Sequence, residues 1–222
     1  VWCSVGTCNS CYVSVVYAPL LAPPLFTSGP SKILQLYNYA SVGYVVSHET
    51  GHAFDDDGRF LNEHRQKTPL WSVNTNERFE EKKSCFVEQF NSYDIPGIRN
   101  ETTGQPIKEN GERTFNENLA DSIGLRAAFA GFQKASQNLQ LERLPYLEEY
   151  DHNQLFFISY ANLWCEYKSQ NFLRTSVLNK NREHSESCLR TNGVVSNMVE
   201  FSKAFKCKPN DKMNRPQKCK LW

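Results

Sequence analysis

The sequence has almost no net charge and no long apolar run. Its 222 residues include 25 Lys or Arg and 24 Asp or Glu, which gives a formal net charge of +1. That balance gives no reason to expect a nucleic-acid partner. No run approaches the roughly 18 apolar residues that would cross a bilayer, so any membrane association would depend on a segment outside this chain.

Basic residues are concentrated only near the C-terminus. We interpret this stretch as a solvated tail tied down by cysteines. A nucleic-acid or membrane-surface module is a competing hypothesis, and the basic stretch is its support. The residues are Lys203, Lys206, Lys208, Lys212, Arg215, Lys218 and Lys220.

The eight cysteines lack the paired CxxC spacing that is typical of a structural zinc site. Scattered cysteines indicate long-range disulfides in an oxidising compartment. The sequon Asn100-Glu101-Thr102 lies in a polar stretch where a glycan could be attached. We therefore expect an extracellular or cell-surface location.

An initiator Met, a secretory signal and internal repeats are also missing. The start, Val1-Trp2-Cys3, has no basic stretch before an apolar core, and we expect the chain to be a piece of a larger protein. Apolar residues make up 40% and charged residues 22%, which is ordinary for a globular domain with a buried core.

Hydrophobic periodicity predicts a mainly α-helical fold with a minor strand component. A strand is expected at 12–17, before the prolines at 19, 23 and 24. Residues 94–113 are expected to form a loop, because Pro and Gly recur there. The expected helices span about 31–55, 74–93, 115–137 and 153–168, with shorter pieces after them.

The segment His48-Glu49-Thr50-Gly51-His52 has the HExxH form. On a helix, positions i and i+4 share a face, so His48 and His52 could bind one Zn²⁺. Glu49 could then take a proton from a zinc-bound water as it attacks a peptide carbonyl. A chance match is the alternative, and the continuous apolar stretch before His48 favours a buried catalytic helix.

A second i, i+4 pair offers a third ligand. Glu117 and Asp121 share one helical face, which Gly124 and Ala128 continue, and small residues allow close packing against the zinc helix. Glu117 could complete the metal site while Asp121 accepts a hydrogen bond from a ligating histidine. Thr114 and Glu117 also have the spacing of a capping box, which is an open alternative that leaves Asp121 unexplained.

Together these motifs resemble the neprilysin and endothelin-converting-enzyme family of zinc metallopeptidases. Residues 48–56 are similar to its HExxHxFDD signature, 117–121 to its ExxAD signature, and 219–222 to its CxxW terminus. Further similarity lies at Pro23-Pro24, Gln154-Leu155-Phe156-Phe157 and Trp164-Cys165. The resemblance covers nearly the whole chain. It implies a thermolysin-like, gluzincin-type catalytic region from a larger two-lobed protein.

The resemblance also implies roles for single residues. One Zn²⁺ would be held by His48, His52 and Glu117, with Glu49 as general base. The remaining implied roles are orientation of the ligating histidines by Asp55 and Asp121, oxyanion stabilisation by His184, and binding of a substrate carbonyl by Arg190. An apolar pocket for the side chain after the scissile bond would be lined by Val45, Leu163 and Trp164, for which plain core packing is the alternative.

The family pattern further implies a disulfide between Cys85 and Cys219. It would pair Cys165 and Cys207 with cysteines of an N-terminal region that this chain lacks, so we expect both to be free thiols here. That missing region is also the expected partner of this chain, beside peptide substrates.

Three departures from the family pattern concern substrate binding. Ser4-Val5 stands in place of an Asn-Ala pair, Ser185 lacks the usual following Pro-Gly, and Arg182 stands where an acidic residue is common. The expected function is a zinc-dependent endopeptidase that cuts oligopeptides on the N-terminal side of hydrophobic residues. The alternative is a catalytically impaired or inactive relative that acts as a binding protein.

These interpretations divide one catalytic region into three parts. Residues 1–30 form a strand and turn segment, 31–137 the zinc-site helices, and 138–222 a C-terminal helical part with His184, Arg190 and the CxxW terminus. The protein would be secreted, or be the ectodomain of a single-pass type II membrane protein.

Overall fold

The computed structural model describes residues 4–8, 11–15, 18–137, 139, 141 and 143–221, with the backbone alone for the first two ranges. Helix dominates, which confirms the predicted class. The described strands form two separate antiparallel pairs, β1 (Ser4–Cys8) with β2 (Cys11–Val15) and β3 (Asp94–Arg99) with β4 (Pro106–Lys108). The described α-helices are α1 (Lys32–Tyr37), α2 (Tyr44–Gly51), α3 (Val73–Asn91), α4 (Phe115–Ser136), α5 (His152–Leu163), α6 (Gln170–Leu178), α7 (Ser187–Ser196) and α8 (Val199–Ala204).

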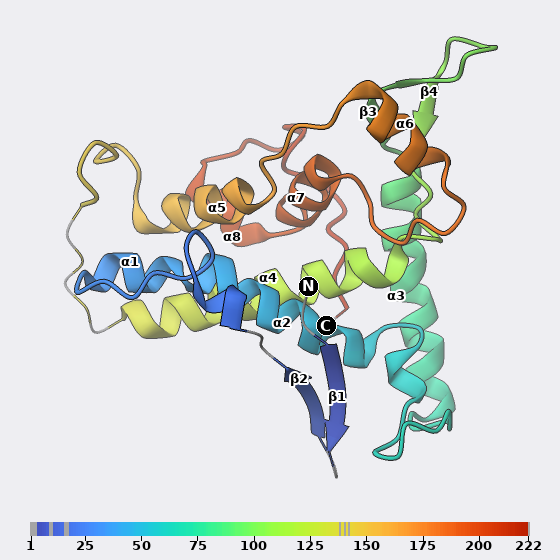
Figure 1. Cartoon of the computed structure of the whole chain (residues 1–222), viewed down its shortest axis with the longest axis horizontal. Helices are drawn as coiled ribbons and strands as arrows, with labels where there is room; N and C mark the ends of the chain where they lie inside the picture. The colour runs from blue at the N-terminus through green and yellow to red at the C-terminus, as the bar shows by residue number, and fades with distance from the viewer. Residues whose placement is uncertain are drawn as a thin grey trace.

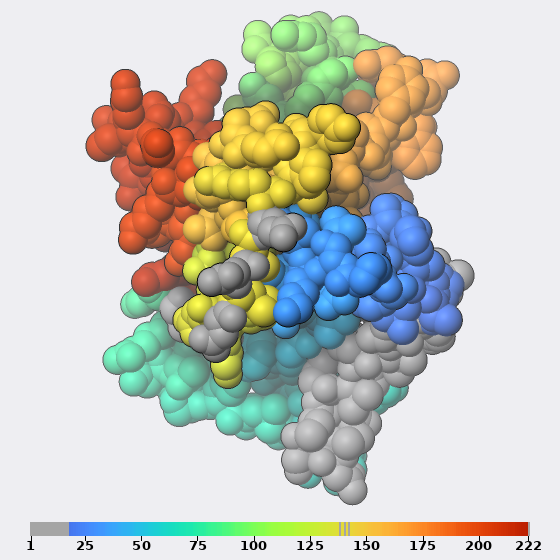
Figure 2. All heavy atoms as spheres, turned by 90° about the vertical axis from the view of Figure 1, so that its left-hand side faces the viewer, coloured from blue at the N-terminus to red at the C-terminus, as the bar shows by residue number. Residues whose placement is uncertain are grey.

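Helix α4 runs through the middle of the molecule, with α2 along one side and α5, α7 and α8 on the other (Figure 1). Its N-terminal half is almost entirely buried, which explains its apolar and small residues. Figure 2 shows α1 (blue) against the yellow segments at the far end of α4 and the start of α5. The site described below therefore lies on a helix that is packed on several sides.

The predicted helix over 31–55 is present as a continuous helical stretch of several parts. Between α1 and α2 lies a π-helical segment, η2 (Tyr39–Gly43), and after α2 a 3₁₀ turn, η3 (His52–Phe54). The amide of Gly43 donates to Asn38 O at 2.8 Å, an i to i−5 bond. A Cβ at Gly43 would lie 3.2 Å from that oxygen, so glycine suits the wider turn.

Backbone contact between α2 and α4 depends on small residues. A Cβ at Gly124 would lie 2.7 Å from the backbone nitrogen of His48, and a Cβ at Gly51 would lie 3.0 Å from the Cα of Ala120. Real Cβ atoms essentially never show the contact at Gly124 and rarely show the one at Gly51, so glycine at both positions lets the two helices pack this closely. The close packing places the start of α4 beside the end of α2.

Two aromatic clusters stabilise this arrangement. Four phenylalanine rings pack between α4 and α5, namely Phe129, Phe132, Phe156 and Phe157. The centroids of the rings that contact each other are 5.0–6.0 Å apart. Such pairs contribute about 0.5–1.5 kcal/mol each beyond the burial of their area. A second cluster joins α3 to α4 and contains Phe79, Phe86, Phe115, Leu119 and Cys219.

Three boundaries differ from prediction. Residues 94–113 contain the β3–β4 hairpin rather than only loop, because an irregular register lets an edge strand hold Pro96 and Gly97. β1 was not predicted, and the strand expected at 12–17 is β2, with residues 16 and 17 outside the described part. Helix α5 ends at Leu163, five residues before the expected end, where the chain turns toward the site.

None of the described helices is both long and apolar enough to span a bilayer.

Candidate metal centre and active site

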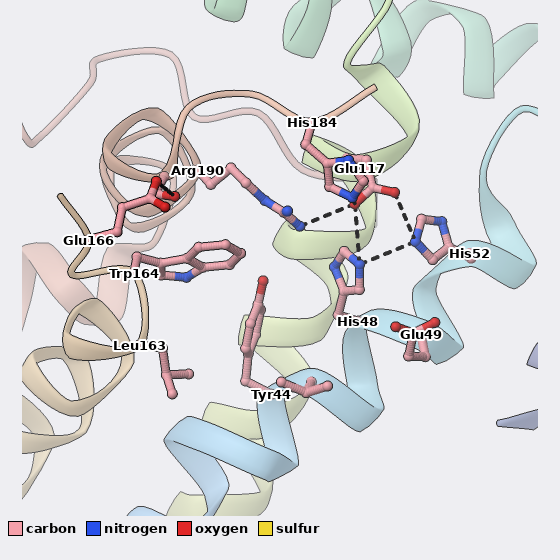
Figure 3. Close-up of a pocket in the computed structure, with 12 residues that line it drawn as sticks. Tyr44, His48, Glu49, His52, Glu117, Leu163, Trp164, Glu166, His184 and Arg190 are labelled. Carbon is pink, nitrogen blue, oxygen red and sulfur yellow. Dashed lines mark hydrogen bonds and ion pairs between the residues drawn. The ribbon is translucent and has the colours of Figure 1, made fainter. Parts of the chain in front are cut away.

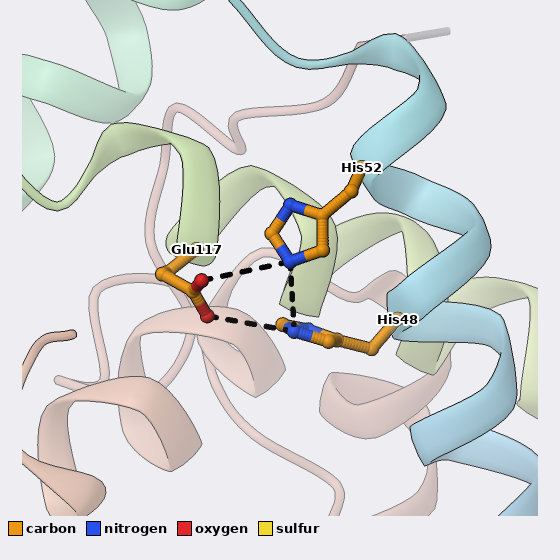
Figure 4. Close-up of side chains that lie close together, drawn as sticks. All are labelled: His48, His52 and Glu117. Carbon is orange, nitrogen blue, oxygen red and sulfur yellow. Dashed lines mark hydrogen bonds and ion pairs between the residues drawn. The ribbon is translucent and has the colours of Figure 1, made fainter. Parts of the chain in front are cut away.

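Three side chains from two helical segments converge at the contact of α2 and α4 (Figure 4). The Nε2 atoms of His48 and His52 are 3.2 Å apart. The carboxylate of Glu117 lies 3.4 Å from Nε2 of His48 and 3.5 Å from Nε2 of His52. Ligand atoms of a tetrahedral Zn²⁺ at about 2.0–2.1 Å lie about 3.3 Å from one another, so this donor set fits a zinc ion. Among the described residues these three form a group that could hold a metal ion, and we call it the metal-binding cluster.

Each histidine has a carboxylate at its other ring nitrogen. Asp121 Oδ1 lies 2.8 Å from Nδ1 of His48, which is within ion-pair distance. The N–H of that nitrogen does not point well enough at the oxygen to count as a hydrogen bond. Asp55 Oδ2 lies 2.8 Å from Nδ1 of His52. The second oxygen of Asp55 accepts the backbone amides of Asp57 and Gly58, which fixes its orientation. Both carboxylates favour the tautomer that leaves Nε2 free for a metal.

Without a metal, the electrostatics of this cluster favour a protonated His48 next to an ionised Glu117. Burial alone would lower the pKa of His48, but Asp121 and Glu117 outweigh it and raise the pKa to about 9. Burial would raise the pKa of Glu117, but its contacts with His184 and His48 outweigh it and hold that pKa well below its usual range. Glu117 is therefore ionised at neutral pH, as a carboxylate ligand of a metal must be.

The capping-box alternative for Glu117 is not formed. Thr114 is the N-cap of α4, but its hydroxyl donates to Asn110 O and accepts from Asn118 rather than capping the helix. Glu117 is directed at His48 and His52 instead (Figure 4). The spacing of Thr114 and Glu117 therefore has no capping role.

A buried arginine binds the carboxylate behind His48. Arg190 donates from Nε and Nη2 to the two oxygens of Asp121, each at 2.7 Å, and from Nη2 to Glu117 at 3.2 Å. Its guanidinium carbon lies 4.3 Å from the ring centre of Trp164. The hydroxyl of Tyr44 also donates to Asp121. Asp121 is thus fully buried but surrounded by donors, which hold its pKa low although burial would raise it.

Sequence reasoning missed Tyr44. It lies four residues before His48, on the same face of α2, so the i, i+4 rule that identified His52 also places Tyr44 at the site. In an apolar helix a tyrosine is commonly a core residue, and its position relative to His48 was the available signal.

The metal-binding cluster opens into a pocket of about 600 Å³ (Figure 3). One side, the zinc-side wall, is formed by Tyr44, Val45, His48, Glu49, His52 and Glu117. The other, the 163–190 wall, is formed by Leu163, Trp164, Glu166, His184, Ser187 and Arg190. Every residue predicted for substrate binding therefore lines the same pocket. Glu166 and Ser187 were not predicted.

His184 reaches the cluster from the 163–190 wall. Its Nε2 lies 3.1 Å from Glu117, while its side chain is 57% exposed. Glu49 lies beside the two histidines and lines the pocket (Figure 3). The structure brings together His48, Glu49, His52, Glu117 and His184, as the sequence predicts for a metallopeptidase.

Comparison with known proteins agrees with this geometry. The family model of peptidase family M13 matches residues 9–221. The chain belongs to peptidase family M13. Human neprilysin is 35% identical over 208 residues, which are 92% of this chain and 26% of neprilysin. Human endothelin-converting enzyme 1 is 35% identical over 206 residues, 92% of this chain and 25% of that enzyme.

Solved structures show the same M13 fold. The Haemonchus galactose containing glycoprotein complex superposes with a TM-score of 0.79 at 30% identity, over 94% of this chain and 33% of that one. The zinc metalloprotease Zmp1 of Mycobacterium tuberculosis, solved with an inhibitor, also gives a TM-score of 0.79, at 24% identity over 97% of this chain and 31% of that one. The resemblance to the neprilysin family is confirmed. The chain spans about a quarter of the length of these curated relatives.

A disulfide joins Cys85 of α3 to Cys219, with a Cα–Cα distance of 5.7 Å. Cys165, Cys188 and Cys207 are free thiols. Asn100 is exposed in the turn between β3 and β4, where its side chain accepts the amides of Thr102 and Thr103. The Ser4-Val5 departure lies on β1, whose side chains are outside the described part.

Proposed function

We propose that this M13 chain is the catalytic part of a zinc-dependent endopeptidase. The observation that supports this best is the convergence of His48, His52 and Glu117 at tetrahedral spacing, with Glu49 in the same pocket. The rest of the complete protein would supply the remaining part of the substrate cleft. Residues 1–30, 31–137 and 138–222 would act as three parts of one catalytic region.

A zinc ion held by the three ligands would lower the pKa of a coordinated water to about 7 and polarise the scissile carbonyl. Glu49 would take the proton of the attacking water on its carboxylate and deliver it to the leaving amine. Asp121 and Asp55 would keep the two ligating imidazoles in the tautomer that leaves Nε2 available.

Two donors on the 163–190 wall would act on the substrate. Nε2–H of His184 would donate to the developing oxyanion, since it already lies 3.1 Å from an anionic oxygen at the edge of the cluster. Arg190 uses Nε and Nη2 on the carboxylates, and Nη1 is the group that would donate to a backbone carbonyl of the substrate.

The proposed preference is for oligopeptides cut on the N-terminal side of a hydrophobic residue. Val45, Leu163 and Trp164 give the pocket beside the cluster an apolar lining that suits such a side chain. One methylene in a pocket of this kind changes selectivity by about 10–200-fold, so size rather than absolute exclusion would set the preference.

We also propose an extracellular or cell-surface location, either secreted or as the ectodomain of a single-pass type II membrane protein. The disulfide between Cys85 and Cys219 and the accessible Asn100 sequon support an oxidising, glycosylating compartment. Any membrane anchor would lie outside this chain.

The alternative, an inactive relative that binds rather than cuts, is not favoured. It depends on the departures at Ser4-Val5 and after His184, and neither removes a proposed ligand or Glu49. The curated relatives include a converting enzyme, and a solved relative is a zinc metalloprotease.

The complete protein should cleave oligopeptides that contain hydrophobic residues, with the new N-terminus at the hydrophobic residue. A chelator should abolish cleavage and added Zn²⁺ should restore it, as followed by mass spectrometry of the products. Zinc bound without any cleavage would favour the binding-protein alternative.

Metal content tests the ligand set separately. Glu117→Gln should reduce retained zinc sharply, by more than the 10–100-fold typical of losing an outer partner of a ligand. Glu149→Gln, an exposed carboxylate far from the cluster in the sequence, is the matched control. Equal zinc in Glu117→Gln and the parent protein would remove Glu117 from the ligand set.

A further inference from the structure

Arg182, the basic residue at a position where the resembling family commonly has an acid, has a buried partner. Its guanidinium pairs with the carboxylate of Glu109 through both terminal nitrogens, with Nη1 3.1 Å from Oε2. The side chains of Arg182 and Glu109 are 9% and 0% exposed. A buried bidentate ion pair of this kind fixes the geometry of both side chains.

Glu109 is a buried residue that is held in place by backbone hydrogen bonds. It lies shortly before α4, the helix that carries Glu117 and Asp121. Its backbone amide donates to Tyr93 O at 3.0 Å, and its carboxylate accepts the amide of Asn110 at 2.8 Å. A group paired with Glu109 is therefore held relative to the start of α4.

The same guanidinium holds the backbone of His184. Nη1 of Arg182 donates to the carbonyl oxygen of His184 at 2.9 Å. Residues 179–186 lie between α6 and α7, outside regular secondary structure, and the His184 side chain is largely exposed. His184 is therefore not held by a helix. The orientation of its imidazole toward Glu117 depends on the hydrogen bonds and ion pairs that fix the backbone of residues 179–186.

Further ion pairs connect the same guanidinium to the rim of the pocket. Glu186 lies 3.5 Å from Nη1 of Arg182 and pairs with Lys168 at 2.7 Å. Lys168 in turn pairs with Glu166, which lines the pocket, at 2.7 Å. The segment around His184 is thus held from two sides, by Glu109 and by the rim.

We propose that Arg182, paired with Glu109, is a positioning residue for the peptidase reaction. It holds the His184 backbone so that Nε2 faces the edge of the metal-binding cluster, where an oxyanion would form. This role rests on the proposed function. At position 182 this chain has a basic residue where the family commonly has an acid. The buried carboxylate of Glu109 pairs with that arginine, so the change need not remove a catalytic function.

The first test removes both charges together in the complete protein, so that no buried charge is left unpaired. Glu109→Leu with Arg182→Met should lower kcat about 10- to 100-fold, because a small misplacement of a catalytic group has an effect of that size. KM and zinc content should stay within about twofold. Affinity for a phosphonate peptide, which resembles the transition state, should fall by the same factor as kcat/KM. Amide hydrogen exchange over 180–186 should become faster in the metal-free protein.

A charge swap separates positioning from stability. Glu109→Arg with Arg182→Glu restores an ion pair, but a carboxylate cannot donate to the His184 carbonyl. Thermal stability should therefore stay near the parent value, as in the neutral double variant, while kcat stays low. Arg182→Lys keeps one donor and should recover part of kcat. Arg174 lies in the neighbouring α6 and pairs with the exposed Glu101. Arg174→Met breaks that pair and is the matched control, which should leave kcat unchanged.

Parent kcat in both double variants, in a protein that loses turnover on His184→Ala, would overturn the role of Arg182 and leave the proposed function intact. A loss of kcat accompanied by an equal loss of zinc or thermal stability would also overturn it, because the effect would then be structural. A zinc-loaded parent protein without any cleavage would overturn the proposed function itself, and this role with it.

Discussion

The two walls of the pocket are held in place by different forces. The zinc-side wall consists of helix-borne residues on α2, η3 and α4, and glycines bring its helices to backbone contact. In the 163–190 wall, His184 and Glu166 lie on irregular chain that is held by ion pairs. Packing therefore places the proposed metal ligands, whereas charges place the proposed transition-state donor. The two walls should differ in their response to mutation, pH and salt.

The largest expected effect concerns chemistry on the zinc-side wall. Glu49→Gln should reduce turnover by about 10²–10⁴-fold and leave zinc content unchanged, because the amide cannot take a proton. Steady-state kinetics and metal analysis on the complete protein would measure both. Turnover at the parent rate would contradict the assignment of Glu49 as general base.

Next in size is the covalent link behind the zinc-side wall. Replacing Cys85 and Cys219 by Ser should lower the free energy of unfolding by about 2–5 kcal/mol, since the bond closes a loop with a sequence separation of 134 residues. Chemical denaturation would measure the loss. Cys188→Ser, at an exposed free thiol, should change stability little, and equal effects of the two changes would argue against a structural disulfide.

Protonation of His48 should make the metal-free protein sensitive to pH. The pKa in the folded state is about 9, above the ordinary 6.5, because Asp121 and Glu117 outweigh the effect of burial. The stabilisation is therefore complete below about pH 6.5 and is lost as the pH rises through about 9. The difference between the two pKa values corresponds to about 3 kcal/mol.

Denaturation of the metal-free protein at pH 6 and pH 9.5 would measure this dependence. His48→Gln should lack it. Zinc binding should strengthen over the same range, because the metal and the proton compete for His48. A pH dependence that persists unchanged in His48→Gln would show that another group causes it.

The smallest expected effect tests the packing that places the metal ligands. Gly124→Ala should destabilise the fold by about 1–3 kcal/mol, since the new methyl group would lie 2.7 Å from the backbone of His48. Zinc affinity should fall with stability as α2 moves away from α4. Gly104→Ser is a control at a glycine with no atom within 4 Å of its added Cβ, although its φ of 67° carries a backbone cost of its own. A fully stable Gly124→Ala would mean that the helices are not held at this distance.

The zinc-side wall could be predicted from sequence because helical spacing determines which side chains share a face. The pairs His48 with His52 and Glu117 with Asp121 follow from that rule alone. The small residues Gly124 and Ala128 indicated close packing between the two helices, and the family resemblance supplied the roles of His184 and Arg190. It also supplied the Cys85–Cys219 pairing that the structure contains.

The remainder depends on contacts that local sequence does not specify. Glu109 and Arg182 are 73 positions apart, and no periodicity relates them. Ion pairs at the rim, such as Lys168 with Glu186, join separate segments in the same way. The β3–β4 hairpin was missed because Pro96 and Gly97 interrupt the alternation that identifies a strand, and an irregular register accommodates them.

In the proposed function, Tyr44 would couple substrate selection to metal binding. Its ring forms part of the pocket lining, and its hydroxyl donates to the carboxylate that contacts His48. A side chain seated in the pocket therefore rests on the same tyrosine that steadies a proposed ligand. Enlarging the pocket at this position would loosen Asp121 as well, so selection or engineering for bulkier substrates would carry a cost in zinc retention. Val45 and Leu163 line the pocket without a hydrogen bond to Asp121. Changes at these two positions would therefore alter substrate preference without affecting zinc retention.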